Sequence, residues 1–449
     1  MAEQRGVAAD RRTRRAAGSR GRRRGDGGAG GPASSAVRPG EQSKRSVAAF
    51  WFSVLLLLVS VGSSAVPSPL YPIYAAMWRL TPIQLTAAFA VYVVALLLSL
   101  LAAGSLSDFV GRKPVLIVGA LGAGLSMTVL AFADAYSMLM IGRALQGLSI
   151  GVLIGTLGAT MLDHSLASRP ALAAVLNGVT PPVALGIGAL SSGILVEWGP
   201  APERLIYLVF GSLLLVFAAL LCLIPETVER KPGALRSLVP SMRVPATSRR
   251  LLRDVSGTLV ASWALAGLYL SLVPSLLSEV FHLDSHFAPG ATIAVFAACG
   301  GLTGYLLKEV DPRREQILGL IALLIGPIVS VLFVITEGLP GMIVGTVIAG
   351  IGFGAGFQSG LRMLLATAAP EHRAGLLATV YVISYLAFGL PSVIAGIVEA
   401  RTGLVVAFTG YGVLVVAAAA VALILQLVSR HPAESAAAAA ARAHKSRAR

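Results

Sequence analysis

The sequence predicts an all-α membrane protein with twelve transmembrane helices, arranged as two six-helix bundles that repeat one another. The first supporting observation is composition, because 56% of the 449 residues are hydrophobic and only 13% are charged, whereas about a quarter of a soluble domain is charged. The second is a series of apolar runs of about 20 residues, the length that crosses a hydrocarbon core of about 30 Å. The third is a single long internal loop, which separates these runs into two equal groups.

Each apolar run is expected to be a helix, because backbone polar groups in lipid must be paired within their own segment. The strand alternation typical of membrane barrels is absent from the sequence. The expected segments are 48–74, 85–106, 115–133, 138–161, 171–196, 205–224, 255–277, 290–307, 316–335, 341–365, 374–398 and 404–428.

The runs divide the chain into five parts. Residues 1–46 are rich in Arg, Gly, Ala and Ser, so they cannot bury enough apolar surface to fold and are expected to be a disordered, basic cytoplasmic tail. Residues 47–224 form the N-terminal six-helix bundle, 225–254 a cytoplasmic linker loop, 255–428 the C-terminal six-helix bundle, and 429–449 a second cytoplasmic tail.

The basic residues that give the chain its net charge of +15 are distributed differently from those of a nucleic-acid-binding protein. Of the 36 Lys and Arg residues, 12 lie in residues 1–46 and five lie from Arg430 onward. Almost all the others lie in loops between apolar runs, where they act as orientation signals and face anionic lipid. We therefore expect the lipid bilayer, and no nucleic acid, as a partner.

Basic residues in the loops also predict the orientation, because cytoplasmic loops carry an excess of Lys and Arg. Fifteen of them fall on one side of the predicted membrane, against three on the other. The expectation is a multi-pass protein of the plasma (cell inner) membrane with both termini in the cytoplasm. The larger set is Arg112, Lys113, Arg169, Arg230, Lys231, Arg236, Arg243, Arg249, Arg250, Arg253, Lys308, Arg313, Arg314, Arg362 and Arg373, and the smaller set is Arg79, Arg204 and Arg401.

Glycines indicate that the two halves are repeats of each other. Three glycines of the fourth segment reappear in the tenth at the same mutual spacing: Gly142, Gly147 and Gly151 become Gly345, Gly350 and Gly354. Parallel six-helix repeats with a substrate site between them are one known transporter plan.

The loop between the second and third segments carries the strongest local motif, with Gly104, Asp108, Gly111, Arg112 and Lys113 at fixed spacing. It resembles the GxxxDxxGR[R/K] signature of the major facilitator superfamily, and all five specified positions match. Glycines at these positions permit a close helix approach and a tight turn, while the arginine offers a planar fork to a carboxylate. The resemblance implies the two-bundle transporter fold of that family.

The fourth segment contains Arg143, Gln146, Gly147 and Gly151, which resemble the RxxQGxxxG pattern of the same family. A charge within a spanning segment costs several kcal/mol, so Arg143 is expected to face a cavity or a partner and to serve coupling together with Gln146 and Gly147. The alternative is that Arg143 extends along the helix toward the membrane interface.

The acid at the end of the fourth segment, Asp163, is placed in the family to meet the arginine of the loop signature. The resemblance thus implies a cluster of Asp108, Arg112 and Asp163 that closes the cytoplasmic gate when the transporter faces outward. Solvated loop charges that contribute almost nothing are the alternative for Asp163.

Substrate contacts are expected on the segments that line the cavity in the family, the first, fourth, seventh and tenth, with help from the fifth and eleventh. The candidates are Ser64, Asn177, Trp263, Tyr269, Gln358, Tyr381 and Tyr385. Each could instead serve helix packing, since polar side chains often bond between membrane helices. No segment carries a carboxylate near its middle, so the cavity should be neutral and aromatic and suit apolar or weakly polar solutes.

Together these features predict a secondary active transporter that works by alternating access and exports a small hydrophobic or drug-like compound in exchange for protons. Export follows from the resemblance, because the central loop begins Pro225-Glu226-Thr227 as in many bacterial efflux-type members. A facilitator or importer of a sugar or other small metabolite is the alternative. We expect a monomer that is not an enzyme, without catalytic residues, a metal site or a cofactor, because no acid, His and nucleophile cluster at one depth of the membrane. ATP hydrolysis is not expected either, since the sequence has no GxxxxGK[ST] loop.

Overall fold

The computed structural model describes residues 39–103, 106–166, 169, 172–234, 244, 246–368 and 373–428. The chain separates into two compact units, Met1–Ser43 and Lys44–Arg449, and the fold described below is that of the second. Most of the expected N-terminal tail and all of residues 429–449 lie outside the described residues.

The N-terminal half runs from α1 to α8. Its first helix begins at Pro39, inside the stretch expected to be a tail, and proline is favourable at the first position of a helix. The elements are α1 (Pro39–Ala65), η1 (Ser68–Leu70), α2 (Tyr71–Trp78), α3 (Pro82–Ala103), α4 (Ser107–Val110), α5 (Arg112–Ala131), α6 (Tyr136–Asp163), α7 (Leu172–Trp198) and α8 (Leu205–Leu221).

The C-terminal half runs from α10 to α16. Helix α10 begins before the apolar run that starts at 255. Its first turns carry Arg249, Arg250 and Arg253, whose charges lower the hydropathy of the segment although arginine favours helix formation. The elements are α10 (Ala246–Ser271), α11 (Val273–Glu279), α12 (Phe287–Leu306), α13 (Pro312–Ile335), α14 (Leu339–Thr367), α15 (Arg373–Thr402) and α16 (Leu404–Val428).

Each of the twelve expected segments falls on helix, and no strand occurs in the described part of the chain. Within that part, ten helices are long and apolar enough to cross a membrane, and α10 with α11 forms a further span bent by 43°. Pro274 stands at the start of α11, where the break occurs. The remaining segment is α8, an apolar helix of 17 residues. The all-α fold is confirmed.

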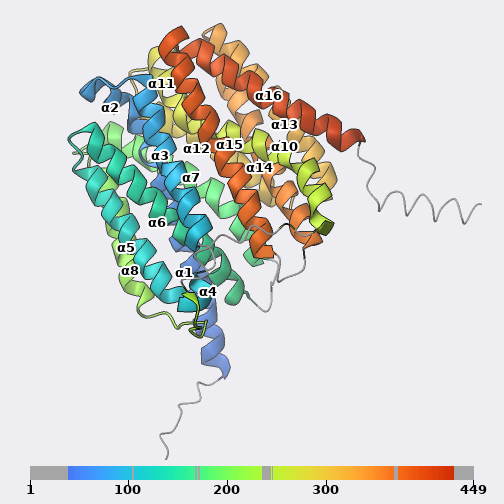
Figure 1. The fold of residues 1–449 in the computed structure, drawn as a ribbon. Coiled ribbons are helices and arrows are strands. Elements are labelled where there is room, and N and C mark those ends of the chain that lie inside the picture. Colours follow the sequence, from blue (N-terminus) through green and yellow to red (C-terminus); the bar gives the residue numbers. More distant parts are fainter. Residues whose placement is uncertain are drawn as a thin grey trace, which may run out of the picture. The chain divides into compact units, whose positions relative to one another are not determined.

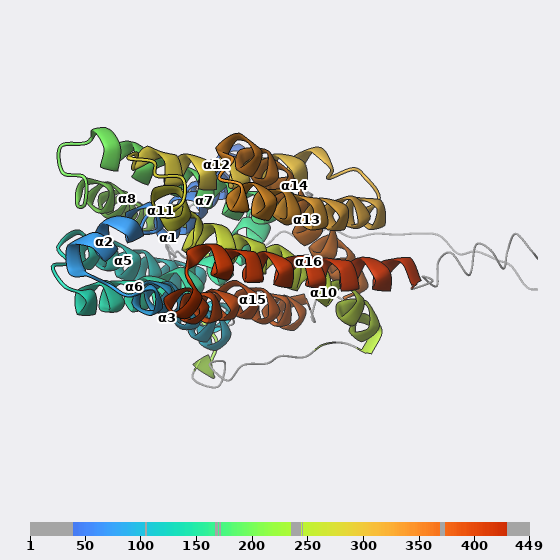
Figure 2. The ribbon, with the colours of Figure 1, turned by 90° about the horizontal axis from the view of Figure 1, so that it is seen from above.

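The helices form two bundles that lie side by side, with α5, α6 and α8 on the left and α10, α13, α14 and α16 on the right in both Figure 1 and Figure 2. In the first bundle α3 and α5 pack on α6, and in the second α12 and α13 pack on α14. The bundles meet mainly along two helix pairs, α7 with α12 and α3 with α15. We call these the two seams between the halves.

Equivalent glycines make equivalent contacts in the two bundles. A side chain on Gly147 or Gly151 of α6 would collide with the backbone of α3, and one on Gly350 or Gly354 of α14 would collide with the backbone of α12. Small residues allow membrane helices this close approach. The glycine repeat in the sequence is therefore also a repeat in the packing.

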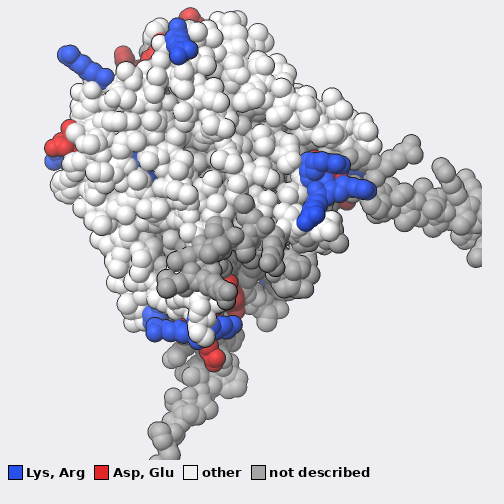
Figure 3. Space-filling model, viewed as in Figure 1, with Lys and Arg blue, Asp and Glu red and all other residues white. Residues whose placement is uncertain are grey.

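Charged side chains gather at the helix ends. On the face shown in Figure 3, Lys and Arg lie toward the ends of the bundles, and a broad band between them carries other residues. Large apolar side chains such as Val118, Leu302 and Val413 are more than half exposed, as expected for helices that face lipid. We call the end with Arg112, Lys113 and Lys308 the basic end and the opposite one, with Trp198, the far end.

Candidate functional site

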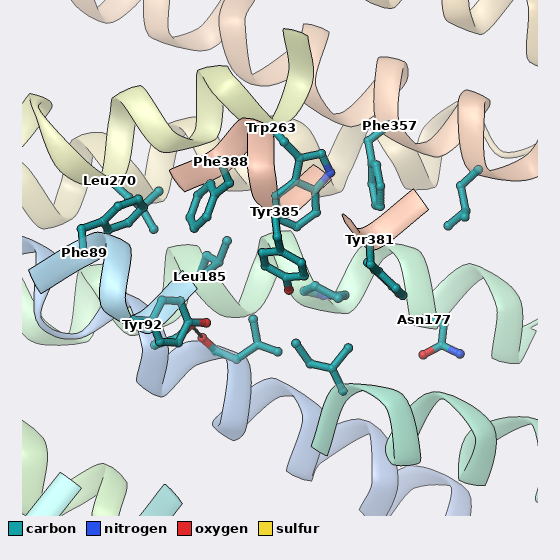
Figure 4. A pocket seen from close by; sticks show the side chains of 15 residues that line it. Phe89, Tyr92, Asn177, Leu185, Trp263, Leu270, Phe357, Tyr381, Tyr385 and Phe388 are labelled. Atoms are coloured by element: carbon teal, nitrogen blue, oxygen red, sulfur yellow. Dashed lines mark hydrogen bonds between the residues drawn. The ribbon is translucent and has the colours of Figure 1, made fainter. Parts of the chain in front are cut away.

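A cavity lies between the two halves, midway along the helices, and Figure 4 shows the side chains around it. Both bundles contribute, through α1, α3, α6 and α7 on one side and α10, α14 and α15 on the other. The lining residues are Val61, Ser64, Phe89, Tyr92, Ile154, Asn177, Pro181, Leu185, Trp263, Leu270, Phe357, Leu361, Tyr381, Tyr385 and Phe388. None of these described residues is charged, so the cavity is neutral and strongly aromatic.

Trp263 of α10 lies at the centre of the aromatic wall. Its ring centroid is 5.0 Å from that of Tyr385, 5.3 Å from that of Phe357 and 5.6 Å from that of Phe388. Phe388 in turn lies 4.8 Å from Phe89 of α3, across a seam. Aromatic pairs at these separations attract one another beyond simple burial, so the cluster joins the halves and shapes the cavity.

The cavity is narrow in this conformation. Its free volume is about 40 Å³, whereas pockets for drug-sized ligands have about 300–1,000 Å³. A ligand of that size therefore requires the two halves, or the aromatic side chains, to move apart.

Of the seven expected substrate contacts, Ser64, Asn177, Trp263, Tyr381 and Tyr385 line the cavity. The other two, Tyr269 and Gln358, do not.

Tyr269 lies inside the C-terminal bundle. Its hydroxyl group is 3.0 Å from Thr346 Oγ1 and 3.3 Å from Ser330 Oγ, and its ring stacks on Phe296 at 4.4 Å. These contacts connect α10 with α12, α13 and α14. They also give the buried tyrosine hydroxyl the polar partners that such a group usually has.

Gln358 lies at the seam near the basic end. It packs against Gly178 of α7 and Gly304 of α12, and its Nε2 atom is buried without a hydrogen-bond partner among the described residues. The two glycines leave just enough room for its side chain between the halves.

The sequence prediction missed the aromatic residues Phe89, Tyr92, Phe357 and Phe388. Helical spacing could have predicted Phe388 as a cavity residue, since Tyr381, Tyr385 and Phe388 fall on one face of a helix. Phe89 and Tyr92 belong to α3, which was not among the helices that the family resemblance led us to expect around the cavity.

Arg143 of α6 is completely enclosed, with 1% of its surface exposed. Its guanidinium group donates to the carbonyl oxygens of Ser64 (3.1 Å) and Ala88 (3.3 Å) and to Gln146 Oε1. The ring of Tyr92 covers its Cζ atom at 4.2 Å, within cation–π distance. The alternative of an interfacial Arg143 does not hold in this structure.

The position of Arg143 also differs from that of a cavity-lining residue. Ser64 and Tyr92 line the cavity and both contact Arg143, whose own side chain lies behind them. Gln146 extends the network by donating to the carbonyl oxygen of Ser63 at 2.9 Å. The guanidinium thus joins α1, α3 and α6 directly behind the cavity wall.

A cluster of charges forms at the basic end. The Arg112 guanidinium lies 2.6 Å from Asp108 and 3.1 Å from Asp163, and it also donates to Ser107 Oγ at 2.6 Å. Gly104 lies outside the described residues. The partners in this cluster all belong to the N-terminal half, so in this conformation the cluster connects helices within one bundle. Its gating role stays a prediction.

Glu226 completes the cluster from the chain after α8. Its carboxylate accepts hydrogen bonds from the backbone N–H groups of Arg112 (2.9 Å) and Lys113 (3.0 Å), the first residues of α5. A carboxylate is favourable at a helix N-terminus. Partial burial raises the pKa of Glu226, but the hydrogen bonds from four backbone N–H groups outweigh it and lower the pKa below its usual value.

Gly111, which precedes α5, has a φ of 100°. A side chain there would also meet the Glu226 carboxyl carbon at 2.9 Å. Both the turn and the capping carboxylate therefore require glycine.

Both seams are tightly packed between the central cavity and the far end. On one seam Gly396 and Gly389 of α15 lie against Thr86 and Val93 of α3, and on the other Gly193 of α7 lies against α12. At these positions the glycines allow the two halves to pack closely.

The fold and the site define a polytopic membrane protein of two six-helix bundles with a neutral, aromatic cavity between them. The chain belongs to the Major Facilitator Superfamily, whose family model matches residues 53–375.

Among its curated relatives are multidrug resistance proteins. The chain is 29% identical over 256 residues to the multidrug resistance protein MdtM of Escherichia coli O157:H7, a match that covers 51% of this chain and 58% of the relative. It is 35% identical over 148 residues to the multidrug resistance protein MdtL of Shewanella oneidensis, covering 32% of this chain and 36% of the relative. The chain thus spans little more than half the length of MdtM and little more than a third of the length of MdtL.

Solved transporters share the fold. A bacterial homologue of the human lysosomal transporter Spinster, in an inward-facing and unoccupied conformation, aligns with a TM-score of 0.65 at 15% identity and covers 85% of this chain and 96% of its own. The human organic anion transporter MFSD10 aligns with a TM-score of 0.61 at 18% identity and covers 86% and 99%.

Proposed function

We propose that this protein is a secondary active transporter that exports a small hydrophobic or drug-like compound by alternating access, in exchange for protons. The observation that carries the proposal is the uncharged aromatic cavity at the interface of two bundles that meet mainly along two seams. A site in this position can be opened to either end by a rocking motion of one bundle against the other.

The chemistry of the cavity supports an apolar substrate. Its aromatic walls suit ligands with rings or alkyl groups, whereas a permanent cation would favour a buried counter-charge that the described lining does not offer. Similarity to proteins named for multidrug resistance also supports export of drug-like compounds.

Arg143 supports a coupling role because it is a buried charge in contact with two cavity-lining residues, Ser64 and Tyr92. Movement of α1 or α3 during transport would disturb its contacts directly. A nearby positive charge also favours the deprotonated form of an acidic group, which is one way to couple proton release to substrate binding.

The orientation that we propose places the basic end and both termini in the cytoplasm, with the monomer in the bacterial plasma membrane. Support comes from the excess of basic loop residues at that end. A reporter fused after Arg449 or inserted near Arg236 should then report a cytoplasmic position. A signal from the opposite side would contradict this orientation.

Transport assays in inverted membrane vesicles test the function. With an imposed proton gradient, vesicles that contain the protein should accumulate fluorescent hydrophobic compounds, and a proton uncoupler should abolish the accumulation. Equilibration of the compounds without accumulation, unaffected by the uncoupler, or uptake of sugars instead, would support the alternative of a facilitator or importer. Vesicles that contain the Trp263→Ala variant provide the matched control, because the substitution removes the central side chain of the aromatic wall.

A further inference from the structure

A second cavity lies on the outside of the α7 and α12 seam and opens toward the lipid. Its free volume is about 350 Å³, much more than the central cavity offers. The lining residues are Val179, Val183, Gly186, Ile187, Leu190, Ala294, Ala298, Gly301, Leu302 and Tyr305. We call this site the seam groove.

The dimensions of the seam groove match one lipid tail in one leaflet. Along α12 the lining extends from Ala294 to Tyr305, which corresponds to about 16 Å at a helical rise of about 1.5 Å per residue. A single leaflet supplies about half of a hydrocarbon core of about 30 Å. Tyr305 stands near the basic end of α12, so the groove runs from the interface at that end toward the membrane centre.

A cation stands where a lipid headgroup would lie. Lys308, just beyond the end of α12, holds its Nζ atom 4.1 Å from the centroid of the Tyr305 ring. No described carboxylate forms an ion pair with Lys308, whereas the neighbouring Glu315 is paired with Arg362. The ammonium group is therefore available to a phosphate, and Tyr305 connects it to the apolar lining.

We propose that the seam groove binds a bilayer glycerophospholipid, with one acyl chain along α7 and α12 and its phosphate group on Lys308. The two walls belong to opposite halves, so the bound lipid contacts both bundles at once. Because a rocking motion changes the distance between α7 and α12, the lipid binds this conformation differently from the alternative one and shifts their equilibrium. The proposal does not depend on the identity of the transported compound.

Photo-crosslinking in nanodiscs tests the groove. Phosphatidylglycerol with a photoreactive acyl chain should label peptides of α7 and α12. Ala298→Phe fills the groove from an exposed position and should reduce this labelling at least fivefold, as should Ile187→Trp on the opposite wall. Ala417→Phe introduces the same side chain at an exposed position of α16 and should leave the labelling unchanged.

The headgroup contact is tested separately. Lys308→Gln should reduce labelling by phosphatidylglycerol severalfold, Lys308→Arg should preserve it, and Arg314→Gln, which removes another exposed charge at the same end, should have no effect. Equal labelling of the wild-type protein and both groove-filling variants would overturn the proposal. So would crosslinks between two copies of the chain through α7 and α12, which would make the groove a dimer interface, or equal labelling of Lys308→Gln.

Discussion

The Glu197 carboxylate at the end of α7 accepts hydrogen bonds from the backbone N–H groups of His286 (2.6 Å) and Phe287 (3.1 Å), where α12 begins. This contact joins the two halves at the far end, and a negative charge at a helix N-terminus is favourable. Hydrogen bonds to a charged group contribute about 1.5–3 kcal/mol each. Loss of the contact should therefore shift the protein toward a conformation that is open at the far end.

We expect Glu197→Ala to increase labelling of a cysteine at Leu270 by a membrane-impermeant reagent about tenfold, because a shift of about 1.4 kcal/mol changes an equilibrium tenfold. Cys222 and Cys299 are first replaced, since they are the only native thiols. Glu197→Gln, which keeps an acceptor oxygen without the charge, should give an intermediate rate. Glu203 is another acid at that end, without a described hydrogen bond across the seam, so Glu203→Ala should be labelled at the same rate as the protein with Glu197 intact. Equal labelling rates in all variants would show that the Glu197 contact does not hold the far end closed.

A second prediction concerns Asp108, whose carboxylate is half exposed and pairs with Arg112. Exposed ion pairs contribute at most about 1 kcal/mol to stability, so Asp108→Asn should fold and reach the membrane at the wild-type level. Transport should nevertheless fall severely if the cluster closes the gate in the outward-facing state, because the two conformations differ by only a few kcal/mol. Normal vesicle transport by Asp108→Asn at equal expression would refute the gating role.

A third prediction concerns Arg143, which donates to acceptors on three helices. Arg143→Ala should abolish gradient-driven accumulation, and Arg143→Lys should restore it only partly, because lysine keeps the charge but loses the planar fork. Removal of the guanidinium group also leaves buried carbonyl and amide oxygens without a donor, which costs about 1–3 kcal/mol. Substrate binding to detergent-solubilised protein separates the two effects, since a coupling residue is required for accumulation but not for binding. Full accumulation by Arg143→Ala would disprove the assignment.

A fourth prediction concerns pH and Glu226. Its pKa in the folded protein is lower than usual, so its contribution to stability is complete above the pKa of the unfolded chain and is lost as the pH falls through the folded pKa. Melting temperatures in detergent should therefore decrease on acidification by less in Glu226→Gln than in the wild type. Glu229→Gln, in the same loop, serves as the control, and identical pH profiles of wild type and Glu226→Gln would contradict the capping role.

The sequence predicted more of the fold than of the site, for physical reasons. Hydropathy must be continuous over a whole span, so every spanning segment could be recognised in the sequence, and the glycines that bring α6 and α14 against their neighbours repeat visibly. Cavity residues leave weaker signals, because Phe89 and Tyr92 are as apolar as residues that face lipid. The capping role of Glu226 could not be inferred, since the contact joins residues more than a hundred positions apart.

The last prediction concerns Trp263, whose Nε1 atom is buried without a hydrogen-bond partner among the described residues. The residue is 7% exposed and lines the central cavity. A buried donor without a partner costs about 1–3 kcal/mol, and a ligand that carries a carbonyl or ether oxygen can supply the missing acceptor. Substrates with such an oxygen should therefore bind more tightly than hydrocarbons of similar size.

Trp263→Phe keeps an aromatic ring but removes the N–H group. It should weaken the binding of acceptor-bearing compounds about fivefold to tenfold, which corresponds to about 1–1.4 kcal/mol, and leave compounds without an acceptor nearly unchanged. Trp51→Phe, a conservative change at an exposed position on α1, is the matched control. Fluorescence titration of purified protein with paired compounds measures the difference. An equal loss for both kinds of compound would assign Trp263 to packing against Tyr385 and Phe357 rather than to recognition of the substrate.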